Sequence, residues 1–530
     1  MSASATPPPA GRAAPSGLSA PAAPPGRAAP AGPSGTAGKA EIRRYSVLVI
    51  CSMTLFMAYL DSSALNVALP TIHLDLHAGV ADLQWVADAY LLVLASLLML
   101  SGSIGDRFGR RRLFTSGLLL FTLGSALCSA APTIGALIVF RMVQALGGCF
   151  LVPASLSIVR QVFSDPVERA RAIGVWSAMF GLGIAAGPII GGALVSSVGW
   201  RSVFWVNIPI GLATWQLARR VVPESRAARG RKFDPVGQLL MVAALATVTY
   251  GLIEGPTMGW GSAVIIAMLC AASASLVVLL AVERRREEPL LEAHFFRSPP
   301  FSAATAIAVA SFLALSGFLF VNTLYLQDVR GDSALVAGTS ILPATVAIAV
   351  CSIGAGHLIG RVGTRIPLAL GGVCIAAGGA LLLNLDPQTS FLLLVASYTL
   401  LGCGFGLVNP PITHTGVSGM PPERAGVASA ITSASRQLGN VLGVAVMGSM
   451  VSAATLGSGR LAGGFASRFT TDSRLSWAVL VACGVVCTLA ALAFTGRRGM
   501  RAAARVYHDD PHVVVGPRAT DQPLSPPVVG

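Results

Sequence analysis

Charged residues are scarce in this sequence, and several motifs that support common activities do not occur. Asp, Glu, Lys and Arg make up 11% of the 530 residues, whereas soluble domains contain about 25%. None of the nine cysteines belongs to a Cys-x-x-Cys pair, and all lie in or beside apolar runs, which predicts small packing residues rather than disulfides. The phosphate-binding motif Gly-x-x-x-x-Gly-Lys-Ser/Thr is also missing, so ATP is not the expected energy source.

Two further absences narrow the class of protein. The net charge is +14, but the basic residues are scattered in short loops without an aromatic-basic patch, so nucleic acid is not an expected partner. His, Asp, Glu and Cys form no cluster beside a sizeable loop, which a membrane-bound transferase would need to hold its acceptor. A polytopic membrane enzyme is therefore much the weaker alternative, and no metal site is expected.

Long apolar runs dominate the rest of the sequence. Hydrophobic residues make up 54% of the chain and the mean hydropathy is +0.71, far above the values of soluble domains. Because a helix needs roughly 20 apolar residues to cross a bilayer, the sequence predicts an all-α membrane protein with fourteen transmembrane helices. The runs cover residues 46–68, 83–104, 113–131, 135–159, 172–195, 202–218, 236–254, 262–282, 301–326, 334–359, 366–385, 390–413, 427–453 and 476–496.

An internal repeat divides the chain. The stretch Gly356–Arg365 echoes Gly102–Arg112 at an offset of 254 residues, and Glu423-Arg424-Ala425 matches Glu168-Arg169-Ala170 at an offset of 255. This spacing predicts two pseudo-symmetric six-helix bundles separated by an inserted helix pair. The predicted segments are a disordered N-terminal segment (1–44), a first bundle (45–220), a two-helix linker (221–298), a second bundle (299–498) and a disordered tail (499–530).

The loops between the runs differ in charge on the two sides of the membrane. Most of their Lys and Arg lie on the side of Asp106, and this side is therefore expected to be cytoplasmic. Both termini are then cytoplasmic, in a multi-pass protein of the plasma membrane. The N-terminal segment has no apolar stretch that would make it a signal peptide. The opposite loops carry only Arg201, Arg330, Arg460, Arg468 and Arg474.

The stretch Gly102–Arg112 is predicted to be a short charged loop between two spans. Arg107 and Arg110 belong to a group of arginines that cannot lie in hydrocarbon, and Asp106 adds one negative charge among them. Gly102 and Gly109 permit a tight turn and close helix approach. A topology anchor would explain the arginines, but it needs neither the glycines nor the aspartate.

Polar side chains inside apolar runs are candidates for a functional site. Asp61 and Asn66 lie in the first run, and Asp88 lies in the second, entering from the same side. A carboxylate in lipid is costly, so these residues are expected to face a cavity or a partner. Two carboxylates in one cavity would suit a proton or a cationic ligand. For Asp61, a place among headgroups at the helix end is an equal alternative.

Basic and amide side chains occur in two other runs. Arg141 and Gln144 lie one turn apart in the fourth run, which favours an interior position over an arginine that extends to the interface. There the guanidinium could lower the pKa of a nearby carboxylate. Arg436 lies in the thirteenth run and is a plausible interior residue as well.

The fifth run carries a periodic glycine pattern. Gly183, Gly187 and Gly191 recur every four residues and form a smooth face on which a second helix can approach closely. Pro188 bends the helix, and Gly192 extends the pattern. Helix packing alone would explain the glycines, whereas the whole pattern Gly-x-x-x-Gly-Pro-x-x-Gly-Gly is more specific.

These motifs resemble the fourteen-helix drug:proton antiporter branch of the major facilitator superfamily. Gly102–Arg112 resembles the family's loop between helices 2 and 3, and Gly183–Gly192 resembles the antiporter motif of its drug exporters. The likeness extends over roughly residues 45–500. It also includes Asn66-Val67-Ala68-Leu69-Pro70, Arg141 with Gln144, Trp200-Arg201, Phe204, Asn207, Pro209, Gly211, Leu324-Tyr325-Leu326-Gln327, Gly338 and Leu342-Pro343.

The resemblance implies a fold and roles for the candidate residues. It implies two bundles that rock around a cavity near the midplane. Arg141 is then expected to assist proton coupling, and Asp61 to contribute to a cation or proton site. Asp106 would latch the cytoplasmic side, and the helix of Gly187 and Pro188 would prevent leak.

The implied function is proton-coupled export of hydrophobic or cationic drugs, antibiotics or secondary metabolites. The proton gradient would supply the energy, without a cofactor, and the partners would be a small molecule, protons and the bilayer. A monomer is favoured, although the sequence does not fix the oligomeric state. An exporter of a specific non-drug solute is the main alternative, and a sensor or scaffold without transport is a weaker one. Self-resistance of an antibiotic producer is a hypothesis by analogy.

Overall fold

The computed structural model describes residues 35–225, 234–283, 293–418, 425–455, 465–496 and 499, without the side chains of some residues in these ranges, such as Asp106. The chain divides into two units, Met1–Arg43 and Arg44–Gly530. The described part of the first unit is the opening of helix α1, and the helical bundle belongs to the second. Helix α1 begins at Gly35, ahead of the predicted boundary. The predicted disordered segments otherwise fall almost entirely outside the described residues.

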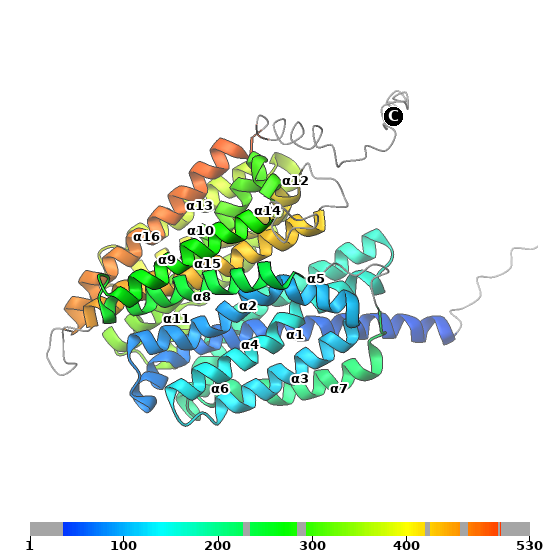
Figure 1. Ribbon diagram of the computed structural model, residues 1–530, viewed down its shortest axis with the longest axis horizontal. Helices are drawn as coiled ribbons and strands as arrows, with labels where there is room; N and C mark the ends of the chain where they lie inside the picture. Colours follow the sequence, from blue (N-terminus) through cyan, green and yellow to red (C-terminus); the bar gives the residue numbers. More distant parts are fainter. Residues whose placement is uncertain are drawn as a thin grey trace, which may run out of the picture. The chain divides into compact units, whose positions relative to one another are not determined.

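Each of the fourteen predicted runs is helical (Figure 1). The first half contains α1 (Gly35–Leu76), α2 (Val80–Phe108), α3 (Arg110–Ser129), α4 (Ile134–Val162), α5 (Pro166–Ser197), α6 (Ser202–Trp205) and α7 (Asn207–Val221). The inserted pair is α8 (Pro235–Met258) and α9 (Ala263–Glu283). The second half contains the short turns η1 (Ala293–Arg297) and η2 (Tyr325–Val329) and the helices α10 (Pro299–Leu324), α11 (Ala334–Ser340), α12 (Leu342–Val362), α13 (Arg365–Leu382), α14 (Phe391–Val417), α15 (Ala425–Thr455) and α16 (Phe465–Phe494).

Several helices begin at a short polar residue that caps the free backbone N–H groups. The Thr133 hydroxyl accepts from the N–H of Ala136 at the start of α4. The Asp165 carboxylate accepts from two backbone N–H groups at the start of α5, and Pro166 occupies the first helical position. These caps stand between apolar runs and fix where each span begins.

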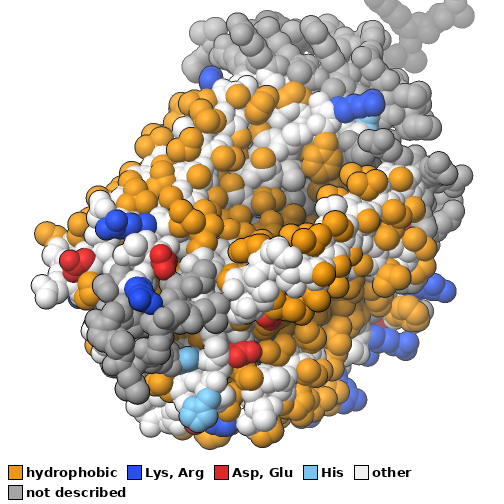
Figure 2. All heavy atoms as spheres, turned by 60° about the vertical axis from the view of Figure 1, so that its left-hand side comes forward, with side chains coloured by type: hydrophobic (Ala, Val, Ile, Leu, Met, Phe, Trp, Pro, Cys, Tyr) orange, Lys and Arg blue, Asp and Glu red, His pale blue; other side chains and the backbone are white. Residues whose placement is uncertain are grey.

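The length and composition of the helices fit a membrane. Twelve helical stretches in the described part of the chain are long and apolar enough to cross one. The predicted run at 202–218 is divided into α6 and α7, and the run at 427–453 is α15, which carries Arg436, Gln437 and Asn440. Hydrophobic side chains cover most of the described surface in the view of Figure 2, as expected of a face in contact with lipid. The all-α membrane fold is thus confirmed.

The prediction of a loop over Gly102–Arg112 is wrong in its extent, because most of this stretch is helical. Helix α2 continues to Phe108, so Gly102, Asp106 and Arg107 are helical, and α3 begins at Arg110. Only Gly109 separates the two helices, with a φ of 107° that favours glycine. Charged residues mark where a helix leaves the hydrocarbon, but they do not end the helix, because helical hydrogen bonds persist in water.

The two halves are built in the same way. In the first half, Gly183 of α5 packs against the backbone of Phe56 in α1, and in the second, Gly439 of α15 packs against Phe312 in α10. Gly187 against Ser63 has its counterpart in Gly443 against Ser316. Both halves therefore use small residues to bring corresponding helices into close contact.

Two seams join the halves. Helix α2 packs against α15, and α5 packs against α11 and α12. The inserted helix α8 packs on both α2 and α15, whereas α9 packs on α8 and is largely exposed. The inserted pair therefore lies along the α2–α15 seam (Figure 1).

Amide side chains connect the halves at one end of the molecule. Gln84 of α2 donates from Nε2 to the carbonyls of Val444 and Ala445 in α15, at 3.0 and 3.2 Å. Gln327 donates from Nε2 to the carbonyl of Val67 in α1, at 2.9 Å. The halves are therefore in hydrogen-bonded contact at the end where α1 ends and α2 begins.

Candidate functional site

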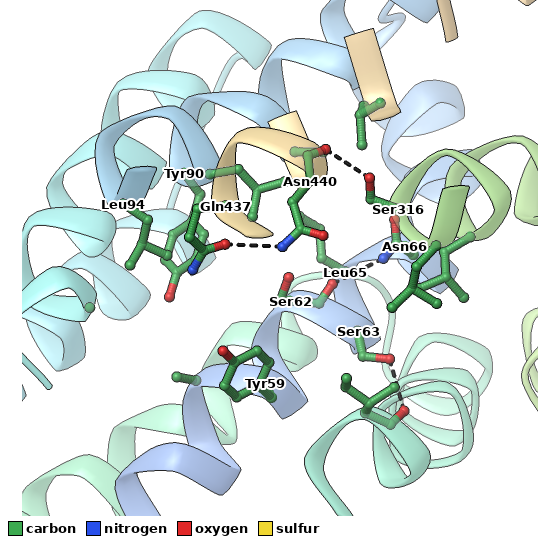
Figure 3. A pocket seen from close by; sticks show the side chains of 18 of the residues that line it. Tyr59, Ser62, Ser63, Leu65, Asn66, Tyr90, Leu94, Ser316, Gln437 and Asn440 are labelled. Atoms are coloured by element: carbon green, nitrogen blue, oxygen red, sulfur yellow. Dashed lines mark hydrogen bonds between the residues drawn. The ribbon is translucent and has the colours of Figure 1, made fainter. Parts of the chain in front are cut away.

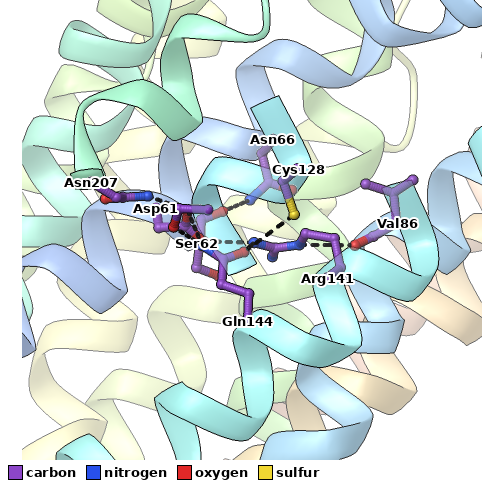
Figure 4. Close-up of polar contacts among 9 residues, drawn as sticks. Asp61, Ser62, Asn66, Val86, Cys128, Arg141, Gln144 and Asn207 are labelled. Atoms are coloured by element: carbon purple, nitrogen blue, oxygen red, sulfur yellow. Dashed lines mark hydrogen bonds and ion pairs between the residues drawn. The ribbon is translucent and has the colours of Figure 1, made fainter. Parts of the chain in front are cut away.

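A buried charge network lies inside the first half. The Arg141 guanidinium of α4 donates from Nη1 to Asp61 Oδ2 of α1 at 2.6 Å. Gln144 Nε2 and Asn207 Nδ2 both donate to Asp61 Oδ1, at 2.9 and 2.6 Å. Asp61 and Arg141 are each 1% exposed, and Gln144 and Asn207 are fully buried. Figure 4 shows Asp61 between Asn207 on one side and Arg141 with Gln144 on the other. Both oxygens of the carboxylate are thus held by donors from two other helices, α4 and α7.

The guanidinium of Arg141 is fixed by further contacts. Its Nε donates to the carbonyl of Val86 in α2 at 3.3 Å, and Nη1 also donates to Gln144 Oε1 at 2.6 Å. The Tyr90 ring lies under the guanidinium, with 4.3 Å between Cζ and the ring centroid. A buried ion pair is tolerated only when such contacts satisfy its remaining donors. Hydrogen bonds here engage Nε and Nη1 of Arg141, and a cation–π contact with Tyr90 adds to them.

A pocket between the two halves borders this network. It contains about 950 Å³ of empty space, which includes space open to solvent. Tyr59 and Ser62 of α1 and Gln437 and Asn440 of α15 line it from opposite halves (Figure 3). Arg141 also lines the pocket, so the charge network and the pocket share one side chain. Asn66 lines it too, with its amide donating to the carbonyl of Ser62 at 3.2 Å.

Asp88 lies apart from both the network and the pocket. Its carboxyl group is fully buried and neither oxygen has a hydrogen-bond partner in the described structure. The pocket face of α2 consists of Ala87, Tyr90, Leu91 and Leu94, and one residue step turns a helix by about 100°. The structure therefore does not bring Asp88 and Asp61 into one cavity.

The glycine pattern of α5 has two contact faces. Gly187 and Gly191 pack against Ser63 and Ala64 of α1, where an added Cβ atom would overlap neighbouring atoms. The Ser63 hydroxyl donates to the carbonyl of Ile184 at 3.0 Å. Gly192 and Pro188 instead face α11 of the other half.

On that second face, a Cβ atom at Gly338 would overlap the carbonyl oxygen of Pro188, and one at Gly192 would lie 2.7 Å from the carbonyl oxygen of Ala334. Side-chain volume is therefore excluded from both sides of α5. Through α5, the first half packs tightly both within itself and against the second half.

The residues around Gly109 lie close to the end of α7. The Arg110 N–H donates to the carbonyl of Ser225 at 2.9 Å, and the Arg111 N–H donates to Glu224 Oε1 at 3.2 Å. Arg107 is exposed. The side chain of Asp106 lies outside the described residues, so its predicted latch remains a prediction.

Arg436 of α15 lies beside the pocket in the second half. Its Nη2 donates to the Thr413 hydroxyl and to the carbonyl of Asn409 in α14. Its guanidinium lies over the ring of Phe312, with 5.7 Å between Cζ and the ring centroid. Phe312 and Gln437 both line the pocket. Arg436 is thus separate from the Asp61 network and on the opposite side of the pocket.

The sequence motifs did not single out every member of the network. Asn207 was part of the family resemblance but was not predicted to be a site residue, and Ser125, which accepts from Gln144 Nε2 at 2.8 Å, carried no signal. An amide within an apolar stretch is the one feature of Asn207 that could have identified it.

The arrangement of helices and the buried network define a transporter of two bundles around a central pocket. The profile of the Major Facilitator Superfamily matches residues 51–444, and the chain belongs to this family. It is a multi-pass membrane protein.

Individual relatives are consistent with that assignment. The multidrug resistance protein Stp of Mycobacterium tuberculosis is 40% identical over 406 residues, which cover 77% of this chain and 75% of that protein. The tetracenomycin C resistance and export protein of Streptomyces glaucescens is 36% identical over 407 residues, 77% of this chain and 76% of that protein. The crystal structure of a bacterial homologue of the human lysosomal transporter Spinster, inward-facing and unoccupied, superposes with a TM-score of 0.61 at 18% identity. The superposed part covers 88% of this chain and 98% of the Spinster homologue. At 18% identity, this likeness shows the fold alone.

Proposed function

We propose that this protein exports hydrophobic drugs, antibiotics or secondary metabolites across the cell membrane in exchange for protons. Its relatives are a multidrug resistance protein and an antibiotic resistance and export protein, which supports the substrate class. The observation that carries the proposal is the buried Asp61–Arg141 pair, whose arginine lines the pocket between the two halves. In this proposal the proton gradient is the energy source, and no cofactor and no catalysis are involved.

The geometry suggests how proton and substrate would be coupled. A proton on Asp61 would neutralise the carboxylate and leave the buried Arg141 without a counter-charge, which is costly. Because Arg141 also lines the pocket and stacks on Tyr90, this change would reach the substrate space directly. Proton binding and substrate binding would therefore favour different arrangements of the two halves.

Alternating access also requires contacts that break and reform. The hydrogen bonds from Gln84 and Gln327, together with the contact of Pro188 with Gly338, join the halves at one end. In the proposed cycle these contacts separate when that end opens, while the packing within each half is kept. Asp106 as a latch at the other side is part of the same proposal.

The proposal can be tested in everted membrane vesicles energised by respiration, with a fluorescent dye that reports the acid interior. Ethidium, chloramphenicol and nalidixic acid are added in turn, so that a cation, a neutral molecule and an acid are all offered. For wild type we expect at least one drug to release protons from the vesicles. Asp61→Asn and Arg141→Ala should abolish the release at equal protein levels.

Asp75→Asn is the matched control, because Asp75 is a second carboxylate of α1 paired with an arginine, but at the surface. It should retain the wild-type response. If no drug releases protons from wild-type vesicles, the drug export proposal fails and a narrow-substrate exporter becomes the hypothesis to pursue. If Asp61→Asn keeps full proton release, Asp61 is not the coupling residue.

A further inference from the structure

The pocket and its surroundings have an uneven charge distribution. Among the described residues, no Asp or Glu lines the pocket. Asp61, the carboxylate of the buried network, is 1% exposed and already accepts hydrogen bonds from Arg141, Gln144 and Asn207. The side chains of the first half that line the pocket therefore offer a cationic ligand no free negative charge.

Arg436 supplies the opposite charge, and it has no counter-ion among the described residues. Its contacts are the Thr413 hydroxyl and the Asn409 carbonyl, which are uncharged, and the Phe312 ring. Its Nε atom is buried and has no hydrogen-bond partner within the described chain. A guanidinium with uncharged neighbours and a spare N–H can still bind an anion.

Arg436 is not itself among the residues that line the pocket, but its guanidinium lies over the ring of Phe312, which lines it, so this charge is next to the ligand space. Gln437 is its chain neighbour and Asn440 lies one turn further along α15, and both line the pocket. Asp61 and Arg141 cancel each other, whereas no charged group among the described contacts of Arg436 offsets its charge, and such a charge is weakly screened in a low-dielectric interior.

We propose that the pocket takes amphipathic molecules with an apolar body and a negatively charged or strongly acidic group, such as a carboxylate or an acidic enol, and that Arg436 binds this group. The apolar side chains of Phe180, Phe312 and Leu319 face the body, while Asn66 and Gln437 offer amides to its hydroxyl and carbonyl groups. This assignment rests on the proposed export function and narrows its substrate class. It departs from the sequence-based expectation of cationic substrates.

Arg436 also has a structural contact, because it joins α15 to α14 through Thr413 and Asn409. A purely structural arginine would affect every ligand equally. A charge-binding arginine would affect only the acid. The two roles are therefore separated by ligands that share one body and differ in the charge of the head group.

The test uses full-length protein in lipid nanodiscs and three pyrene probes, with empty nanodiscs subtracted. The probes are 4-(1-pyrenyl)butanoate, its methyl ester and the matching trimethylammonium compound, and binding is followed by pyrene fluorescence. We expect wild type to bind the acid about tenfold more tightly than the ester or the ammonium, as one charge-assisted hydrogen bond allows. Arg436→Gln should reduce acid binding to the level of the ester and leave ester binding unchanged, while Arg436→Lys should keep part of the preference.

Arg365→Gln is the matched control. Arg365 also belongs to the second half and donates to a backbone carbonyl of a neighbouring helix, that of Leu492, but it is exposed. It should bind all three probes as wild type does. The proposal is overturned if wild type prefers the ammonium or binds none of the probes, or if Arg436→Gln weakens acid and ester by the same factor.

Failure of this proposal can be told apart from failure of the export function. Proton release driven by ethidium or chloramphenicol is measured independently of the pyrene probes. If that release persists while the acid preference is missing, the exporter stands and the assignment of Arg436 falls. If no drug drives proton release, both fall.

Discussion

The two halves have the same helix packing but different buried polar chemistry. In the first half, Asp61 and Arg141 join α1 to α4 as an ion pair. In the second half, the corresponding helices α10 and α14 are joined by a neutral hydrogen bond, from Tyr398 Oη to Asn322 Oδ1 at 2.6 Å. The architecture therefore does not require an ion pair between these two helices. The first half holds an ion pair, and the second half holds Arg436 beside the pocket, with no counter-ion among the described residues.

Arg141→Ala is expected to have the largest effect of the variants that test this difference between the halves. The substitution leaves the Asp61 carboxylate buried with amide donors but no cation, and we expect a loss of about 3–5 kcal/mol in unfolding free energy. Thermal unfolding of the purified protein measures the loss. The double variant Asp61→Asn/Arg141→Gln removes both charges and should recover most of the stability. Equal melting temperatures for Arg141→Ala and wild type would show that the pair is not closed in the membrane.

Gly338→Ala probes the place where the halves meet. The new methyl group would overlap the carbonyl oxygen of Pro188, so the α5–α11 seam should separate at a cost of about 1–3 kcal/mol. Drug-driven proton release should fall severalfold, because the end that α5 and α11 close can no longer seal. Gly354→Ala is the matched control, since no atom lies within 4 Å of an added Cβ there. Equal activity of the two variants would contradict the close approach.

Tyr398→Phe removes the neutral bond of the second half. It leaves Oδ1 of the fully buried Asn322 without its hydrogen-bond donor, and we expect about 1–2 kcal/mol of destabilisation. The effect should stay below that of Arg141→Ala, because no charge is left unpaired. Tyr250→Phe, whose hydroxyl makes only a long contact to the Met258 sulfur, should be close to neutral. A larger loss for Tyr398→Phe than for Arg141→Ala would reverse the contrast between the halves.

The smallest effect is expected for Asp75→Asn. Asp75 and Arg201 form an ion pair at 2.7 Å, like Asp61 and Arg141, but their side chains are 47% and 37% exposed. Solvent screens such pairs, so the variant should lose at most about 1 kcal/mol. Its melting temperature, measured at low and high salt, should therefore stay near that of wild type. A loss as large as that of Arg141→Ala would mean that burial does not set the strength of these pairs.

The sequence identifies the helices well, because apolar runs of this length rarely form anything other than membrane-spanning helices. Helix ends were less predictable, as shown by α2, which passes through the predicted loop to Phe108. Spacing alone could not reveal that Asp61, Arg141 and Asn207 meet, since they come from three helices that only tertiary packing brings together. The separation of Asp88 from the pocket likewise depends on the rotation of α2 about its own axis, and two candidate carboxylates in neighbouring runs contain no information on that angle.

The inserted pair changes what the surrounding lipid meets. Helix α8 lies on α2 and α15 and carries α9 on its outer side, whereas the seam of α5 with α11 and α12 belongs to the opposite pair of helices. The two lipid-facing sides of the molecule therefore differ, because only one of its two seams is covered by the inserted pair, although the two bundles are related by near symmetry. A compound dissolved in the acyl chains meets a shielded seam on one flank and a different, glycine-lined seam on the other.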